Sequence, residues 1–357
     1  MTFTIIIGAI VVFFAFLQDK NKFSHGLKIS FLILTLFLGL RYNFGNDYQS
    51  YLNGFNEINR YSYISFFDTR FYFDPGWVFI CKLFNPFGFF SLIFFLSIVN
   101  CVVYYKVIKR YVPQGFYWLA VFLYFFTPGF MLVHLSAIRQ SISILIFLFI
   151  VKYIYMRKPL FYFTGILIAS FFHQSALILS VFYTLIFFSG KIKNQTGLLL
   201  GIAFFVLFFI SNIVFLQLDN FILTFFPKYL ITYSQLGSVI GSGIGIFLYL
   251  VLFIILLWSQ KAFKDEQLLL HRFAILGFFF IPLSLVMAMI GRIGMYFQIF
   301  KILVFPILLC NSKLIILKYT TAFILIVVTL YAFKIYFDEN SLYHQTYLTI
   351  FSAPRIF

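Results

Sequence analysis

The sequence has few charged residues: Asp, Glu, Lys and Arg make up only 10% of its 357 residues. Soluble domains carry roughly 25%. Hydrophobic residues instead make up 63% of the chain, and the mean hydropathy is +1.01. This composition excludes a soluble enzyme, a nucleic-acid-binding domain and a disordered chain. It indicates that lipid surrounds most of the protein.

Cysteines and cofactor motifs are also scarce. Cys81, Cys101 and Cys310 each lie in an apolar run, which is typical of packed thiols and not of a disulfide framework or a metal site. The chain has no Walker A sequence, no His-Glu-x-x-His and no Asp-x-Asp pair. The glycines between 237 and 245 follow no predicted strand, so they do not indicate a dinucleotide-binding turn. We therefore expect no metal and no cofactor.

Long apolar runs account for most of the chain, and a run of about 17–25 residues can cross a bilayer as a helix. Such runs lie near 2–17, 27–40, 88–105, 116–133, 138–155, 197–215, 244–259, 271–290, 295–310 and 315–336. The stretch 160–188 is longer and has a polar break at His173-Gln174-Ser175, which predicts two short helices that meet at a turn. We predict an all-α polytopic bundle of about 11–12 transmembrane helices, a single membrane domain over 1–357.

The basic residues separate the apolar runs and favour one side of the membrane. One set of alternate loops holds 16 of the 26 Lys and Arg against three acids, a net charge of +13, whereas the other side has a net charge of +3. By the positive-inside rule the first set is cytoplasmic and both termini face outward. The cytoplasmic loops are short, so we expect chemistry at the outer face, where segments 41–87 and 216–243 are longest.

Polar residues at membrane depth are costly, and the first cluster of them follows the second apolar run. Arg41 lies at the end of that run, Gly45 permits a turn, and Asp47 can cap a helix. This helix is predicted to be amphipathic and to lie on the outer surface. Its apolar residues recur at i, i+3, i+7 and i+10, as Tyr48, Tyr51, Phe55 and Ile58. Alternatively, Arg41 and Asp47 form only an anchoring ion pair within an aromatic belt.

Two further clusters lie at predicted helix starts. Asp74-Pro75-Gly76-Trp77 is a helix-start signal with Asp74 as the N-cap, and capping alone is its simplest explanation. Ser136, Arg139, Gln140 and Ser143 recur at i, i+3, i+4 and i+7, which predicts one polar helical face. Such a face should line a water-filled cavity, unless Arg139 only extends to the headgroups.

The last two clusters add a histidine and a third arginine. His173 lies at the apex of the broken helix, where freed backbone groups need a cavity or protein partners, although a lone histidine is often simply hydrogen-bonded. Arg292 and Tyr296 lie one turn apart near the ends of later spans. Guanidinium groups bind phosphate oxygens bidentately. Arg41, Arg139 and Arg292 on one face of the membrane therefore predict an anionic headgroup as the ligand.

In this order the motifs resemble the EpsG/Wzy family of bacterial polymerases, which join repeat units of O-antigen, capsule and exopolysaccharide. The resemblance covers about residues 25–300, and the family more often has Glu at the position of Asp74. The matching motifs are Arg41-x-x-x-Gly45-x-Asp47-Tyr48-x-x-Tyr51, Asp74-x-Gly76-Trp77, Arg139-Gln140, Phe172-His173-Gln174-Ser175-Ala176, and Arg292 before Tyr296.

The resemblance implies a GT-C-like glycosyltransferase of the bacterial cytoplasmic membrane, with an outward-facing active site and no nucleotide sugar. Its substrates would be undecaprenyl-pyrophosphate-linked glycans. The partners that the resemblance implies are the lipid bilayer and a chain-length regulator and flippase of the same pathway, with no nucleic acid. Together with the polar clusters, it assigns catalysis to His173, Asp74 and Asp47, and substrate binding to Arg41, Arg139, Arg292, Tyr48, Gln140 and Tyr296.

Other classes of membrane protein fit parts of this pattern. A flippase or exporter of the same lipid-linked glycan would also need an arginine-lined cavity, but transporters tend to show internal repeats and this chain shows none. An acyltransferase or an O-antigen ligase-like enzyme would also act at the outer face. A ligase-like enzyme should have a larger outer loop late in the chain than the segment 216–243.

The charge asymmetry generates a topology prediction. Reporter fusions at Lys109, Lys158, Lys193 and Lys264 should be cytoplasmic, and fusions near Asn56 and Ser234 should be external, because basic loops are retained inside. Paired phosphatase and fluorescent-protein fusions measure this directly. An external signal at Lys193 would contradict the two-pass interpretation of 160–188.

Overall fold

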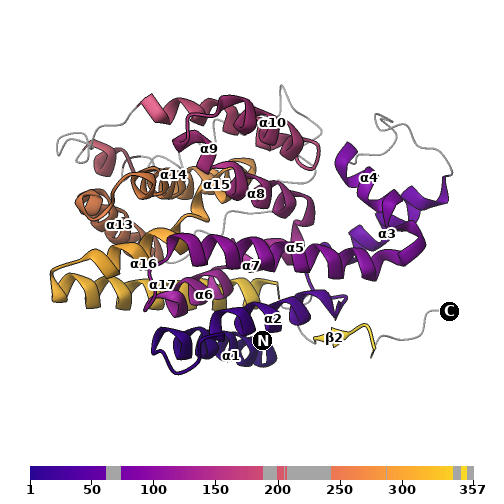
Figure 1. Cartoon of the computed structure of the whole chain (residues 1–357), viewed down its shortest axis with the longest axis horizontal. Helices are drawn as coiled ribbons and strands as arrows, with labels where there is room; N and C mark the ends of the chain where they lie inside the picture. The colour runs from indigo at the N-terminus through magenta and orange to yellow at the C-terminus, as the bar shows by residue number, and fades with distance from the viewer. Residues whose placement is uncertain are drawn as a thin grey trace. The chain divides into compact units, whose positions relative to one another are not determined.

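The computed structural model describes residues 1–61, 74–187, 199–204, 206, 243–286, 288–340 and 347–351, which are almost entirely helical (Figure 1). This confirms the all-α prediction. The α-helices are α1 (Thr2–Asp19), α2 (Gly26–Gly39), α3 (Tyr48–Arg60), α4 (Pro75–Leu83), α5 (Gly88–Tyr111), α6 (Tyr117–Phe126), α7 (Met131–Ser136), α8 (Ile138–Ile150), α9 (Lys152–Tyr155), α10 (Pro159–Ser170), α13 (Gly243–Trp258), α14 (Glu266–Val286), α15 (Ala288–Gln298), α16 (Lys301–Asn311) and α17 (Ile315–Glu339). The 3-10 helices are η1 (Asn85–Phe87), η2 (Gln174–Phe187) and η3 (Ser259–Ala262), and β1 (Arg41–Tyr42) pairs antiparallel with β2 (Leu348–Thr349).

Many of these helices suit a membrane. Among the described residues, six helical segments are long and apolar enough to cross one: Thr2–Asp19, Asn85–Tyr111, Ile138–Tyr155, Glu266–Ser284, Ile290–Asn311 and Ile315–Glu339. The shorter apolar helices are Gly26–Gly39, Tyr117–Phe126, Pro159–Ser170, Gln174–Tyr183 and Phe247–Ala262. The chain is therefore a multi-pass helical membrane protein, as predicted.

The structure corrects the sequence prediction at two helix breaks. The run 116–133 is not one helix: α6 ends at Phe126, before Pro128, which lacks an N–H donor and disfavours helix in the residue before it. Ala137, with φ −111° and ψ 65°, then separates α7 from α8. Ser136 therefore does not share a helical face with Arg139.

Most of the predicted run 197–215, and all of 216–243 except Gly243, lies outside the described residues.

The chain divides into two compact units. The first contains Met1–Ile186 and Ala332–Phe357, and the second contains Phe187–Tyr331. In the first unit Gly26 lets α1 and α2 approach closely, since a Cβ there would lie 2.0 Å from the carbonyl oxygen of Phe14. The Ser30 hydroxyl donates to the Val11 carbonyl at 2.6 Å. In the second unit α14 packs on α15 and α16.

The predicted break in 160–188 is present. Helix α10 ends at Ser170, and η2 begins at Gln174. The two halves lie side by side: the Tyr162 hydroxyl donates to the Leu179 carbonyl at 2.7 Å, and the Tyr162 and Tyr183 rings are 5.4 Å apart. The turn between them carries His173, so it brings a polar side chain to the end of two apolar helices.

Candidate functional site

A buried apolar cluster fixes the helices that carry the candidate site. The apolar face of α3 is buried as predicted, and Trp77 of α4 is fully buried with its ring 5.1 Å from that of Tyr51. Ile138, the residue before Arg139, belongs to the same cluster. The members are Tyr48, Tyr51, Phe55, Ile58, Trp77, Val78, Cys81, Phe89, Leu92, Ile93, Leu96 and Ile138. Arg139 and Asp74 thus project from adjacent, tightly packed helix ends.

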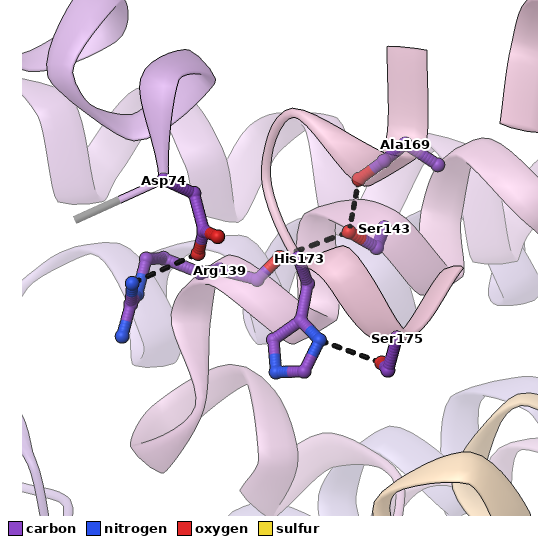
Figure 2. Close-up of polar contacts among 6 residues, drawn as sticks. All are labelled: Asp74, Arg139, Ser143, Ala169, His173 and Ser175. Atoms are coloured by element: carbon purple, nitrogen blue, oxygen red, sulfur yellow. Dashed lines mark hydrogen bonds and ion pairs between the residues drawn. The ribbon is translucent and has the colours of Figure 1, made fainter. Parts of the chain in front are cut away.

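Asp74 and Arg139 form an ion pair at the start of α8. The Arg139 Nη1 atom lies 2.8 Å from Asp74 Oδ2, and the side chains are 27% and 13% exposed (Figure 2). Asp74 occupies the N-cap position of α4, with Pro75 at the first helical position, as predicted. However, its side chain makes no capping hydrogen bond. Capping alone is therefore the wrong explanation for Asp74, because its carboxylate neutralises an arginine on another helix.

Gly76 joins this ion pair to the broken helix. The Gly76 N–H donates to the Phe171 carbonyl at 2.8 Å. A Cβ at this position would lie 2.9 Å from that oxygen and 3.1 Å from the Phe172 ring. Only glycine allows α4 to begin this close to the turn. The contact brings Asp74 and His173 to the same part of the first unit, as Figure 2 shows.

His173 is half-buried and has a hydroxyl partner. Its Nδ1 atom lies 2.6 Å from the Ser175 Oγ atom. The turn is also held to α8, because the Ala169 carbonyl accepts both the Ser143 hydroxyl, at 2.8 Å, and the His173 N–H, at 3.1 Å. Ser143 lies one turn after Arg139 on α8. One helix therefore positions both the guanidinium and the histidine turn (Figure 2).

Burial shifts the pKa values of two side chains beside Arg139. Burial raises the pKa of Asp74 above its usual value, and the Arg139 charge and hydrogen bond oppose that rise without cancelling it. Burial also raises the pKa of Tyr51, and Arg139, which hydrogen-bonds the phenol, again opposes the rise. Arg139 is thus shared between a carboxylate and a phenol. Asp74 is a stronger base than an exposed aspartate.

Arg41 is fully buried, and its contacts differ from those predicted. Its guanidinium donates to the carbonyls of Leu38, at 2.9 Å, and His134, at 3.4 Å, and lies 6.0 Å from the Tyr48 ring centroid. Burial lowers the pKa of Arg41 to about 10. The predicted ion pair with Asp47 is not formed, because Arg41 has turned into the protein whereas Asp47 is exposed at the start of α3.

The remaining predicted site residues have varied surroundings. Tyr48 is fully buried, and its hydroxyl donates to the Arg41 carbonyl at 3.4 Å. Gln140 is buried in the first turn of α8. Arg292 and Tyr296 lie on α15 of the second unit, where Arg292 is exposed and Tyr296 is fully buried. Their roles stay predictions. Within the described residues, no three His, Cys, Asp or Glu side chains are grouped as metal ligands.

A buried polar network was missed from the sequence. His134 lies between two hydroxyls, with Nε2 3.3 Å from Ser97 Oγ and Nδ1 3.2 Å from Ser141 Oγ. The first contact joins α5 to α7, and the second joins α7 to α8. Ser97 and His134 lie in mainly apolar runs, and Ser141 lies beside Gln140 in the next segment, so no spacing in the sequence links the three. The His134 carbonyl also accepts the Arg41 side chain, which connects this network to the first predicted cluster.

The fold and the site together define a multi-pass helical membrane protein with a cationic and acidic cluster at its helix ends. A family model matches residues 27–348, and the chain belongs to the EpsG family, a family of Wzy-like polysaccharide polymerases. This confirms the family that the sequence motifs indicated. Neither a curated protein nor a solved structure matches the chain.

The Gly76 contact generates a test of the site's geometry. In Gly76→Ala the added Cβ must move α4 away from Phe171, so Asp74 should leave Arg139 and polymer yield in cells should fall at least about 10-fold. Polysaccharide gels and immunoblots of membranes measure yield and insertion. Gly201→Ala is the control, because a Cβ there meets no atom of the described residues within 4 Å. Normal polymer from Gly76→Ala would show that this contact does not support the site.

Proposed function

We propose that this protein polymerises lipid-linked oligosaccharide repeat units at the outer face of the cytoplasmic membrane. The donor is a growing glycan on undecaprenyl pyrophosphate, and the acceptor is a single lipid-linked repeat unit. Family membership supports a polymerase of this kind. The observation that carries the proposal is the cluster of Asp74, Arg139 and His173, drawn from three separate segments onto one part of the first unit.

The reaction is a substitution at the anomeric carbon of the donor sugar. The acceptor hydroxyl oxygen forms the new glycosidic bond, and the bond to the donor's pyrophosphate breaks. The pyrophosphate leaves with the electron pair, and a base takes the hydroxyl proton. Negative charge therefore develops on the leaving group, and a base is needed on the opposite side of the sugar.

Arg139 suits the leaving group. It is partly exposed, permanently charged, and located in the first turn of α8, where the helix dipole also favours an anion. Asp74 holds the guanidinium in place. Helix α4 itself contains no acidic residue that would repel an anion at this position. In this proposal Asp74 is a positioning residue for Arg139, and a pyrophosphate oxygen joins it at the guanidinium.

His173 is the better candidate for the base. Histidine titrates near neutral pH, and when Nδ1–H donates to Ser175, Nε2 carries the lone pair that accepts the proton. Asp74 is the second candidate, since its pKa is raised but its carboxylate is engaged by Arg139. Asp47 is third because it is exposed at the start of α3. Its predicted pairing with Arg41 no longer argues against it.

Removal of the Arg139 guanidinium should strongly reduce polymerisation without preventing membrane insertion. Arg139→Ala should reduce polymer about 100-fold, because losing one preorganised charge costs about 3 kcal/mol of transition-state stabilisation, and single lipid-linked repeats should accumulate. Arg139→Lys should restore activity only partly, since an ammonium lacks the bidentate fork. Arg292 carries the same expectation from its motif alone.

The matched control for this test is Arg157→Ala, which removes an exposed arginine between α9 and α10. Glycan ladders and extracted lipid-linked repeats provide the two measurements. Long polymer at normal yield from Arg139→Ala would remove Arg139 from the reaction.

The acid–base groups separate a polymerase from a flippase, which has no hydroxyl proton to remove. Purified protein in liposomes should lengthen lipid-linked repeats without any nucleotide sugar. His173→Ala should abolish growth yet still bind substrate, and Asp74→Asn should weaken both growth and pyrophosphate binding. Ser180→Ala is the control, because Ser180 lies on η2 away from the His173 turn. Transbilayer movement of the lipid with no chain growth would instead establish a flippase.

A further inference from the structure

The polar face of α3 contains a pocket that is not part of the site described above. Its volume is about 370 Å³, within the range of roughly 300–1,000 Å³ found for small-molecule sites. The lining residues are Asn53, Asn56, Glu57, Arg60 and Tyr61. All five are exposed. Asn53, Asn56, Glu57 and Arg60 lie on the face of α3 opposite its buried residues, and Tyr61 directly follows the helix. A solvated helix face would be convex, whereas this one is hollowed.

The walls of the pocket are held in place from behind. The apolar face of α3 is packed into the cluster described above, with Phe55 4% exposed and Ile58 fully buried. The end of the helix is tied to α4 twice: Asn59 Nδ2 donates to the Cys81 carbonyl at 3.3 Å, and Lys82 Nζ donates to the Tyr61 carbonyl. The polar side chains therefore project from a fixed backbone, which lowers the ordering cost of binding.

The lining selects for one kind of ligand. Two carboxamides, a carboxylate and a guanidinium supply both donors and acceptors, whereas the single ring is that of Tyr61, which is 46% exposed. Glu57 and Arg60 balance in charge, and within the described residues neither forms an ion pair or a hydrogen bond. A lipid tail would leave these groups unsatisfied, and a simple anion would be repelled by Glu57. A sugar has hydroxyls that donate and accept, and a C–H face that packs on an aromatic ring.

We propose that this pocket is a glycan subsite, which binds a sugar of the repeat unit away from the reacting bond. The proposal rests on the polymerase function and deepens it. Helix α3 connects the two places: Tyr51, two residues before Asn53, hydrogen-bonds Arg139 from the buried face. In the proposed complex, a distal sugar of a glycan held at Arg139 by its pyrophosphate reaches the pocket around α3, which with its side chains is about 10 Å across. The pocket therefore contributes to the choice of repeat unit.

Two assays test the subsite. In the first, lipid-linked repeats extracted from the native strain are polymerised by purified protein in liposomes. Asn56→Ala and Glu57→Gln should each raise KM about 5- to 10-fold and leave kcat within about twofold, since each removes ground-state hydrogen bonds far from the reacting carbon. Ser50→Ala is the matched control, an exposed polar residue of α3 outside the pocket.

In the second assay, the oligosaccharide released from those lipids by mild acid is titrated into detergent-solubilised protein and followed by calorimetry. Asn56→Ala and Glu57→Gln should weaken its binding by the same factor, whereas Arg139→Ala should not, because the probe has no pyrophosphate. Glu57→Gln keeps the shape of the side chain, so its effect is not one of folding.

The outcomes of the two assays are distinguishable. Unchanged KM and unchanged oligosaccharide affinity in both pocket variants would overturn the subsite while leaving the polymerase function intact. If the wild-type protein binds the oligosaccharide through these residues but never lengthens lipid-linked repeats, the subsite stands and the polymerase function fails.

Discussion

The Arg139 guanidinium lies at the start of an apolar helix, and Asp74 neutralises it at 2.8 Å. The two residues are 65 positions apart, so this ion pair can form only when α4 begins directly beside the start of α8. That requirement brings Gly76 against Phe171 and places the His173 turn next to the pair. One partly exposed ion pair therefore links the segments that carry the polar groups of the site.

Arg41, which is buried, shows a different solution for an arginine charge. Arg41 is fully buried and is bound by backbone carbonyls and the Tyr48 ring, with no carboxylate of the described residues as its ion-pair partner. The C-terminal strand β2 pairs with its backbone, and Tyr347 donates to the Phe37 carbonyl at 2.6 Å. These contacts link the Arg41 segment to distant parts of the first unit. A role in binding a ligand would require its burial to change.

Periodic features were predictable from the sequence. The apolar residues of α3 recur at helical spacing and are buried as expected, and the polar break near His173 does interrupt a helix. The end of α6 was missed because hydrophobicity continues past Pro128, although the missing N–H of proline ends the helix there. The ion pair of Asp74 was missed for another reason: Asp74 does occupy the N-cap position, and nothing nearby in the sequence indicates a partner on α8.

Composition, periodicity and short ordered motifs were enough to predict a membrane environment, the helical class and the family. Which polar groups meet follows from the packing of the helices and could not be predicted. The Asp74–Arg139 pair, the His134 network and the pocket on α3 join residues from separate elements or depend on the hollow shape of a surface. Hydrogen bonds and ion pairs act over about 3 Å, so they are fixed by the packing of helices and carry no signature in the spacing of residues along the chain.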